Sequence, residues 1–227
     1  MRIAIHGRGR MGSLVERVAM LRGHDIAATF DVDAPISATA LAGSDVVVDF
    51  SHASAIDALV AACCEARVAL VTGTTGWDER RAEIEARVTA AGIGMVAAAN
   101  FSPGATIAFA LAREAARLVA LFGEYEAGIE ERHHSKKKDS PSGTALRFAK
   151  EVRDGSVGKL DPQIAASRAG TEVGLHTIFF DSADDLIEIS HRARSREGFA
   201  RGAVVAAERI VGRTGVWQFE KLVAGGD

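Results

Sequence analysis

The amino-acid sequence predicts an α/β protein, in which an N-terminal doubly wound parallel sheet is followed by a C-terminal α+β domain. Across the first hundred residues, short apolar runs alternate with stretches of helical periodicity. This alternation is typical of parallel strands with helices on both faces of the sheet. After Asn100 the pattern changes to one long Ala-rich helix and then to mixed elements. We therefore predict a domain boundary near residue 102.

The first domain is expected to contain five strands and three helices. The strand over Asp45–Phe50 is the clearest, because Val46, Val47 and Val48 are consecutive β-branched residues. The other expected strands are Arg2–His6, Ile26–Phe30, Val68–Thr72 and Met95–Ala99. The expected helices are Met11–Leu21, Ala55–Cys64 and Glu79–Ala91, the last ending at Gly92.

The second domain is expected to mix long helices with an antiparallel hairpin. Gly174–Phe180 and Leu186–Ala193 alternate as hairpin strands around the turn Ser182–Asp185. The segment Arg153–Ala169 carries only a weak pattern. The remaining expected elements are a helix over Pro103–Phe122, a strand over Glu124–His133, a helix over Thr144–Val152 and an apolar helix over Phe199–Val211. A C-terminal helix, about residues 198–227, is expected to pack back on the first domain.

Composition excludes several classes of protein. The chain has 227 residues, 48% of them hydrophobic, and a net charge of -3, which gives nucleic acid and anionic membranes no general attraction. It contains no apolar run long enough for a membrane span and no signal-peptide pattern. The adjacent Cys63 and Cys64 are expected to be reduced core residues. Further cysteine ligands at zinc-site spacing are absent. We therefore predict a cytoplasmic protein without a metal, a nucleic-acid partner or a membrane partner.

A glycine-rich loop follows the first expected strand and opens the first expected helix. Its G-x-G-x-x-G sequence consists of Gly7, Arg8, Gly9, Arg10, Met11 and Gly12. In this context the glycines permit a tight turn, close approach of a pyrophosphate and close helix packing. Asp31 ends the second strand nineteen residues after Gly12, where a carboxylate binds ribose hydroxyls. We favour a Rossmann-like dinucleotide-binding domain over residues 1–101; an ordinary glycine turn beside an exposed Asp31 is the alternative.

The charges near this loop leave the identity of the dinucleotide open. Asp31 and Asp33 would repel the 2′-phosphate of NADPH, which favours NADH. Arg8 and Arg10 could instead pair with that phosphate. We expect NADH to be preferred and NADPH also to be used.

The densest chemistry lies in the basic loop, residues 130–145. It supplies His133, His134 and a run of lysines, followed by Ser-Pro-Ser-Gly-Thr at a helix start. Ser140 fits the N-cap and Pro141 the first turn, and exposed N–H groups at a helix N-terminus bind carboxylates and phosphates. The combination predicts a small-anion pocket with acid–base groups. A solvated lysine loop is the ordinary alternative, and a nucleic-acid patch is disfavoured by the lack of interleaved aromatic residues.

Residues Glu131–Ala145 match E-x-H-H-x-x-K-x-D-x-P-S-G-T-A at every fixed position. This is the signature of the 4-hydroxy-tetrahydrodipicolinate reductase family of diaminopimelate and lysine biosynthesis, which the chain resembles over nearly its whole length. Further segments typical of the family occur in order: G-R-M-G at Gly9–Gly12, D-F-S at Asp49–Ser51, G-T-T-G at Gly73–Gly76, A-A-N-F-S at Ala98–Ser102 and S-R-x-x-F-A-x-G-A at Ser195–Ala203.

The resemblance implies specific roles for residues of this chain. His133 would be the catalytic acid/base and Lys137 the proton donor, with His134, Gly143 and Thr144 binding the substrate. Residues 102–197 would form a substrate-binding and oligomerisation domain, and the protein would be a homotetramer. Besides the glycine loop and Asp31, the cofactor-binding residues would be Gly73, Thr74, Thr75, Ala98, Ala99, Asn100 and Phe101.

The implied reaction is NAD(P)H-dependent reduction of 4-hydroxy-2,3,4,5-tetrahydrodipicolinate, a small dicarboxylate, to 2,3,4,5-tetrahydrodipicolinate. The chain departs from the family at the short Arg153–Ala166 segment, at His52 in place of an arginine, and in lacking a basic residue after Asp31. Two alternatives remain: another oxidoreductase with this fold, such as an aspartate or homoserine dehydrogenase, and a non-catalytic NAD(H) sensor. His176 and His191 lie in expected strands and are interpreted as structural.

Overall fold

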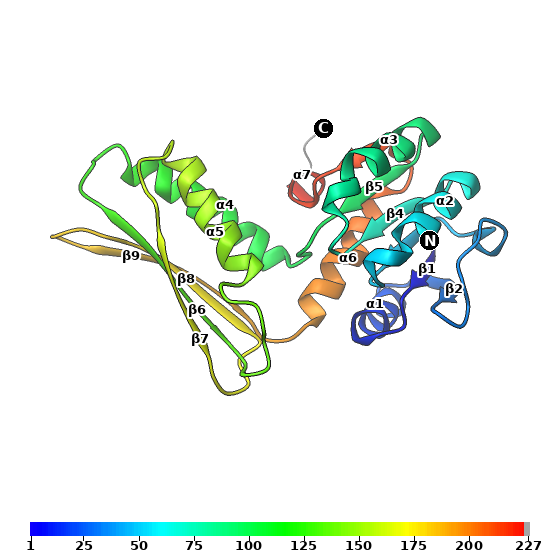
Figure 1. Cartoon of the computed structure of the whole chain (residues 1–227), viewed down its shortest axis with the longest axis horizontal. Coiled ribbons are helices and arrows are strands. Elements are labelled where there is room, and N and C mark those ends of the chain that lie inside the picture. The colour runs from blue at the N-terminus through cyan, green and yellow to red at the C-terminus, as the bar shows by residue number, and fades with distance from the viewer. Residues whose placement is uncertain (225–227) are drawn as a thin grey trace. The chain divides into compact units, whose positions relative to one another are not determined.

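The computed structural model describes residues 1–224, which form two compact units (Figure 1). The first unit combines Met1–Ser102 with the segment that begins at Glu197, and the second unit is Pro103–Arg196. The second unit is thus inserted between two parts of the first. Within the described residues, no helix is both long and apolar enough to cross a bilayer.

The first unit is built on a six-stranded parallel sheet in the order β10-β5-β4-β3-β1-β2. The expected strands are confirmed with small shifts at their ends. Their bounds are β1 Arg2–His6, β2 Asp25–Phe30, β3 Val46–Asp49, β4 Ala69–Thr72 and β5 Gly94–Ala97. Three of these strands are buried along their whole length or nearly so, as expected where helices cover both faces of a parallel sheet.

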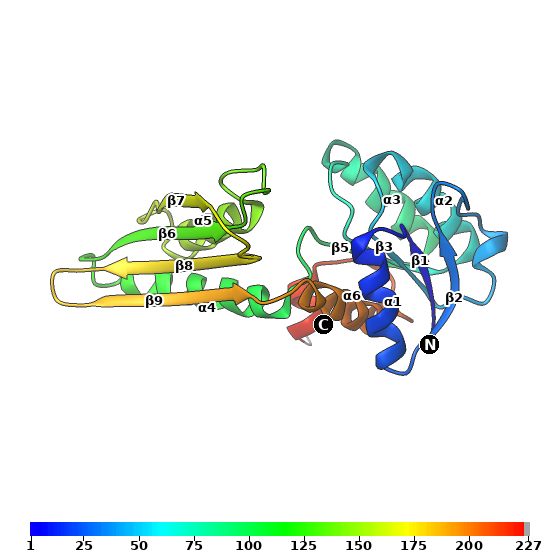
Figure 2. The same cartoon turned by 90° about the horizontal axis from the view of Figure 1, so that it is seen from below.

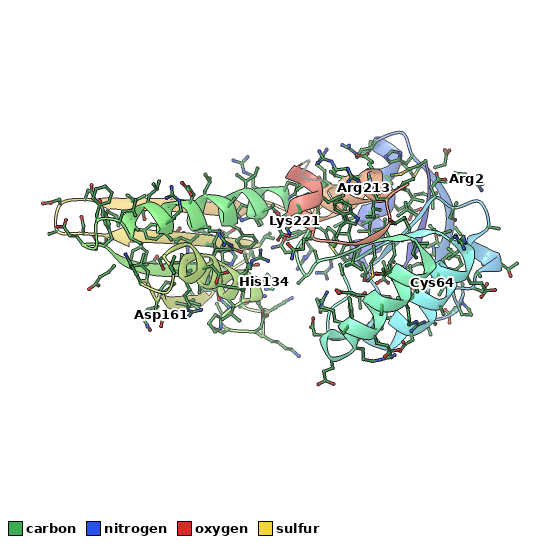
Figure 3. All side chains as sticks on the ribbon, turned by 90° about the horizontal axis from the view of Figure 1, so that it is seen from above. Arg2, Cys64, His134, Asp161, Arg213 and Lys221 are labelled. Atoms are coloured by element: carbon green, nitrogen blue, oxygen red, sulfur yellow. The ribbon has the colours of Figure 1, made fainter. Side chains whose placement is uncertain are left out.

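Helices cover both faces of this sheet. One face packs against α1 (Arg10–Leu21) and α6 (Glu197–Ile210), and the other against α2 (Ile56–Ala66) and α3 (Arg81–Ala91). Short 3₁₀ turns occur at Thr39–Leu41, Ala53–Ala55 and Asp78–Arg80. Cys63 is buried on α2, and its neighbour Cys64 (labelled in Figure 3) is half-buried; both are free thiols. The predicted doubly wound α/β fold is confirmed.

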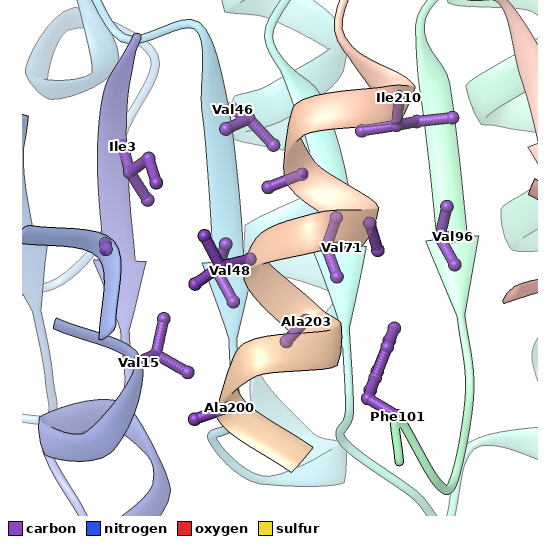
Figure 4. Packing of buried hydrophobic residues seen from close by; sticks show 14 of the residues in the cluster. Ile3, Val15, Val46, Val48, Val71, Val96, Phe101, Ala200, Ala203 and Ile210 are labelled. Atoms are coloured by element: carbon purple, nitrogen blue, oxygen red, sulfur yellow. The ribbon is translucent and has the colours of Figure 1, made fainter. Parts of the chain in front are cut away.

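Helix α6 crosses the sheet although it lies almost a hundred residues after β5 in the chain. Figure 4 shows Ala200, Ala203 and Ile210 of α6 facing the apolar residues of β1, β3, β4 and β5. A Cβ atom built on Gly202 would lie 1.7 Å from the carbonyl oxygen of Phe101. Only glycine at this position therefore lets the helix approach the chain so closely.

The C-terminal segment is more than the single helix expected over residues 198–227. After α6 it forms β10 (Gly215–Trp217) and α7 (Phe219–Ala224); residues 225–227 lie outside the described part. Strand β10 pairs in parallel with β5 and becomes an edge of the sheet. A strand this short has no periodicity to recognise, which is why the sequence did not predict it.

The second unit is a four-stranded sheet with two helices on one face (Figures 1 and 2). The sheet order is β7-β6-β8-β9, with β6 Glu126–His133, β7 Gln163–Arg168, β8 Gly174–Asp181 and β9 Leu186–Ala193. Helices α4 (Pro103–Val119) and α5 (Gly143–Gly155) pack on the sheet. Phe109 of α4 and Phe148 of α5 are buried in one apolar cluster with Ile178 of β8. The predicted hairpin of β8 and β9 is confirmed.

Strand β7 lies in the segment that we expected to be weakly patterned, and it pairs in parallel with β6. Most of its side chains are half-buried or exposed, because it forms the edge of the sheet. Residues 163–168, Gln-Ile-Ala-Ala-Ser-Arg, therefore lack the apolar alternation that reveals a half-buried strand.

The approach of α6 to Phe101 gives a test with a control in the same helix. Gly202→Ala forces a Cβ against a backbone carbonyl, and we expect the melting temperature to fall by roughly 5–10 °C. A Cβ on Gly198 meets no atom within 4 Å, so Gly198→Ala should raise stability by about 0.5–1 kcal/mol through helix propensity. Calorimetry of the two variants measures the difference; equal melting temperatures would contradict the packing.

Candidate active site

The glycine loop joins β1 to α1, and its three glycines have three different environments. Gly7 has φ +91°, and a Cβ there would lie 2.6 Å from the carbonyl oxygen of Phe50. A Cβ on Gly12 would lie 1.9 Å from the carbonyl oxygen of Gly7. Gly9, the N-cap of α1, faces open space and no side chain caps the helix. The loop thus leaves the N-terminus of α1 available for a phosphate.

Asp31 lies beside this loop, as the sequence predicts. Its Oδ2 accepts a hydrogen bond from the backbone N–H of Arg8 at 3.2 Å, and its Oδ1 accepts one from Val32 at 2.9 Å. The backbone hydrogen bonds from Val32 and then Arg8 lower the pKa of Asp31. The side chains of Arg8 and Arg10 are exposed. The residues proposed to hold the dinucleotide therefore form a loop with a fixed negative charge at its edge.

The carboxyl ends of β1, β3 and β4 are joined by the buried side chain of Asp49. Its Oδ1 lies 2.8 Å from His6 Nδ1 and accepts from Ser51 Oγ at 2.6 Å, and its Oδ2 accepts from Thr72 Oγ1 at 2.6 Å. Burial raises the pKa of Asp49, but the hydrogen bonds from His6, Ser51 and Thr72 outweigh it and leave the pKa below its usual value. The D-F-S segment contains this residue, but no role for it follows from the sequence alone.

The other proposed cofactor residues of the first unit surround the same strand ends. A Cβ on Gly73 would meet the ring of Phe50 at 2.1 Å; Thr74 is buried and its Oγ1 accepts from Ser51 N–H at 3.0 Å, whereas Thr75 is exposed. Ala98 donates its N–H to Thr72, Ala99 is exposed and Asn100 is half-buried. Phe101 is 1% exposed and its ring packs on Phe219, so its side chain is not available to a ligand.

Strand register in the second unit brings three titratable side chains together. Glu131 and His133 are two residues apart on β6 and therefore share a face. His176 of β8 pairs directly with Glu131, and all three side chains are buried. The imidazole rings of His133 and His176 meet edge to face, with centroids 5.0 Å apart. His176, which the sequence assigned to structure alone, is thus part of this cluster.

Glu131 is held by a cation and a helix start. Its Oε1 accepts from Arg168 Nη2 at 2.5 Å and from the N–H of Ser142 at 2.9 Å. Ser142, not Ser140, is the N-cap of α5, because its Oγ accepts from the N–H of Ala145. Burial raises the pKa of Glu131, but the hydrogen bonds from Ser142 and Arg168 outweigh it and lower the pKa overall.

Burial lowers the pKa of both histidines of the cluster. It is the main cause that lowers the pKa of His133, against the opposing effect of the Glu131 charge. Burial also lowers the pKa of His176, and the nearby His133 adds to the effect. The free protein therefore favours the neutral form of both rings near neutral pH.

The remaining predicted site residues lie in the loop after β6 and at the start of α5. Lys137 Nζ pairs with the carboxylate of Asp139 at 2.8 Å, and its charge is close enough to lower the pKa of His133. His134 (labelled in Figure 3) donates its N–H to the carbonyl of Glu172. Gly143 is exposed and Thr144 half-exposed at the N-terminus of α5, where N–H groups suit a carboxylate.

Glu131, His133 and His176 also form the one group in the described residues whose ligand atoms could meet a metal ion, all within 4.8 Å of one another. Arg168 already occupies one oxygen of Glu131, and Lys137 adds a second positive charge nearby. Two neighbouring cations oppose the binding of a third. The cluster is better suited to holding protons beside an anion.

A Rossmann-like unit, with a second unit that carries buried titratable side chains and a helix start of the kind that suits a carboxylate, is typical of a dinucleotide-dependent oxidoreductase. Family models described as "Dihydrodipicolinate reductase, N-terminus" and "Dihydrodipicolinate reductase, C-terminus" match residues 1–101 and 104–223. The chain belongs to the dihydrodipicolinate reductase family, as its resemblance to the family predicts.

Relatives of similar length carry the corresponding name. The chain is 34% identical to a 4-hydroxy-tetrahydrodipicolinate reductase of Christiangramia forsetii over 99% of this chain and 98% of the relative. It is 38% identical to one of Stenotrophomonas maltophilia over 94% and 93%. A solved dihydrodipicolinate reductase of a Paenisporosarcina species, with dipicolinate bound, has the same fold with a TM-score of 0.80, at 20% identity and with 96% and 97% of the chains covered.

Substitutions of two glycines in the loop distinguish an effect on folding from an effect on dinucleotide binding. Gly12→Ala should lower the melting temperature and abolish NADH binding, because the new Cβ collides with the Gly7 carbonyl. Gly9→Ala should leave the melting temperature within about 2 °C while weakening NADH binding about tenfold or more, since its Cβ fills the space for a pyrophosphate. Calorimetry and NADH fluorescence titration measure the two effects. Normal NADH affinity in Gly9→Ala would place the pyrophosphate elsewhere.

Proposed function

We propose that this protein reduces 4-hydroxy-2,3,4,5-tetrahydrodipicolinate to 2,3,4,5-tetrahydrodipicolinate with NAD(P)H, as a step of diaminopimelate and lysine biosynthesis. One observation carries the proposal: the family signature Glu131–Ala145 folds into a buried His133 beside Lys137 and a helix N-terminus. This arrangement provides proton donors next to a carboxylate site. The relatives that share the chain's length are named for the same reaction.

The substrate binds through its carboxylates. Gly143 and Thr144 begin α5, and their N–H groups would hold one carboxylate with the aid of His134. The solved Paenisporosarcina reductase has dipicolinate bound, which is likewise a small dicarboxylate. The positive charges of Lys137 and Arg168 complement such a dianion.

His133 and Lys137 are the groups proposed to transfer the proton. Loss of water from the substrate would give a conjugated diene-imine, to which the nicotinamide, when bound, would supply hydride at ring carbon C4. Negative charge then develops toward C3 and the imine nitrogen and requires one proton. A protonated Lys137 stabilises this charge, and His133 and Lys137 deliver the proton. Both groups lie in the second unit, on a rigid strand end and the loop that follows it.

The cofactor proposed as preferred is NADH, with NADPH also used. Asp31 is a carboxylate at neutral pH, its pKa being lowered further by backbone hydrogen bonds from Val32 and Arg8, and with Asp33 it opposes a 2′-phosphate. The residues proposed to bind the dinucleotide are the glycine loop, Asp31, Gly73–Thr75 and Ala98–Phe101.

We also propose that the protein is a homotetramer and is located in the cytoplasm. Association into a tetramer is supported by exposed apolar side chains of the second unit: Ile107, Leu111, Leu118, Leu121, Phe122, Leu146, Leu186 and Ile187.

The test is nicotinamide oxidation by the purified protein, with substrate generated in situ from pyruvate and aspartate semialdehyde by a dihydrodipicolinate synthase. Synthase-dependent oxidation of NADH or NADPH supports the proposal. NADH binding without turnover would favour the sensor alternative. Oxidation that depends on another substrate would favour a dehydrogenase of different specificity.

Substitution of the two proton-carrying residues should impair the chemical step. His133→Gln and Lys137→Met should each lower kcat by about 10²–10⁴-fold, the usual contribution of general acid–base catalysis. NADH affinity should stay unchanged because the glycine loop belongs to the other unit. Lys136→Met removes an exposed neighbouring charge and serves as the control with near-normal turnover. If His133→Gln and Lys137→Met both keep normal turnover, the assigned roles are wrong.

Asp31 should control the choice of dinucleotide. Asp31→Asn keeps a hydrogen-bond acceptor but removes the charge that opposes a 2′-phosphate. We expect the NADPH:NADH ratio of kcat/KM to rise about tenfold, a change of ~1.4 kcal/mol. Asp25→Asn, at the start of the same strand, is the control. An unchanged ratio in Asp31→Asn would remove Asp31 from cofactor discrimination.

A further inference from the structure

We propose that Glu131 is a positioning residue, which holds His133 through Nδ1–H and thereby leaves Nε2 as the atom that exchanges a proton with the substrate. This inference rests on the proposed function, because it takes His133 as the acid/base of the reduction. No role for Glu131 follows from the sequence beyond its place in the signature.

The two oxygens of Glu131 have different environments. Oε1 is fully engaged by Arg168 and by the N–H of Ser142. Oε2 is buried, makes no hydrogen bond that meets strict geometry among the described residues, and faces His133 Nδ1 at 3.4 Å. A buried carboxylate oxygen without a partner is costly. The arrangement therefore favours a donor on Nδ1.

His133 Nδ1 has no competing hydrogen-bond partner among the described residues. Like Oε2, it is buried and lacks a hydrogen bond of good geometry in the described residues. His176 Nε2 also lies 3.4 Å from Oε2, but it has a nearer contact with Ser142 Oγ at 3.1 Å. Glu131 Oε2 and His133 Nδ1, which both lack a hydrogen bond of good geometry, thus face each other at 3.4 Å, slightly more than the length of an ordinary N–H···O hydrogen bond. Catalytic hydrogen bonds are often long in the ligand-free protein and tighten in the complex.

A glycine, Gly174, lies at the opposite edge of the His133 ring, beside Nε2. A Cβ on Gly174 would lie 3.1 Å from His133 Nε2, so a side chain there would press on this edge. The edge-to-face contact with His176 supports the ring from the side. His133 is therefore fixed through Nδ1, while glycine lines the approach to Nε2.

The charges that face His133 come from each element packed around it. They are Glu131 on β6, Lys137 and Asp139 in the following loop, Arg168 on β7 and His176 on β8. Burial, Lys137 and Arg168 lower the pKa of His133, whereas Glu131 and Asp139 raise it. Removing the Glu131 charge should therefore lower the pKa further, and His133 should lose its proton at a lower pH.

The experiment measures His133 directly in the full-length protein with ¹⁵N-labelled histidine, its signal being identified by its absence in His133→Gln. In the unsubstituted protein the neutral ring should carry its proton on Nδ1. In Glu131→Gln the pKa of His133 should fall by about one unit, and the alkaline limb of kcat/KM should move down by the same amount. Glu131→Asp, which keeps the charge, should restore most of the shift. Glu130→Gln, on the exposed face of the same strand, should change neither quantity.

A neutral His133 with its proton mainly on Nε2 in the unsubstituted protein would overturn the proposal, even if Glu131→Gln did not fold. So would an unchanged pKa in a folded Glu131→Gln. Because the NMR readout needs no turnover, it is independent of the activity assay. The expected tautomer together with absent synthase-dependent turnover would refute the proposed reaction but support the orientation of His133.

Discussion

A carboxylate taken out of water costs several kcal/mol unless it is paired and hydrogen-bonded, and this constraint organises the candidate site in each unit. Asp49 meets it with His6, Ser51 and Thr72, so that the ends of three parallel strands are held in register around one side chain. Glu131 meets it with Arg168 and the N-cap of α5. In both units the loops proposed to bind ligands begin where a buried acid has fixed the strand ends.

The order of the elements along the chain shows how the two units are connected. The first unit is completed only after the second has been made, because α6 and β10 cover and extend a sheet whose other strands precede residue 98. Gly202 makes this return possible by letting α6 touch the carbonyl of Phe101. The second unit is therefore tied to the first at both of its ends, after Ser102 and before Glu197.

Sequence reasoning recovered the parts of the fold in which local pattern and tertiary environment agree. Strands β1, β3 and β4 are apolar because both faces are buried, and β8 alternates because one face is buried, whereas one face of β9 is half-buried over most of its length. It missed β7, in which no side chain is buried and apolar residues do not alternate, and β10, which has only three residues. It placed the N-cap at Ser140 because both serines fit the motif, and only the contacts to Ala145 and Glu131 select Ser142. His176 was missed as part of the site because its pairing with Glu131 spans 45 residues.

In the second unit, the protonation of His133 is sensitive to the charges around it. Burial together with Lys137 and Arg168 lowers the pKa of His133, which favours the neutral ring near neutral pH. A dicarboxylate bound at the start of α5, as proposed, would place negative charge beside His133, and nearby negative charge raises the pKa of an imidazole. The substrate would then stabilise the proton that its own reduction consumes. A permanently protonated His133 would need no such coupling, but its charge would have to be buried near Lys137 and Arg168 without the substrate anion, which is the costlier arrangement.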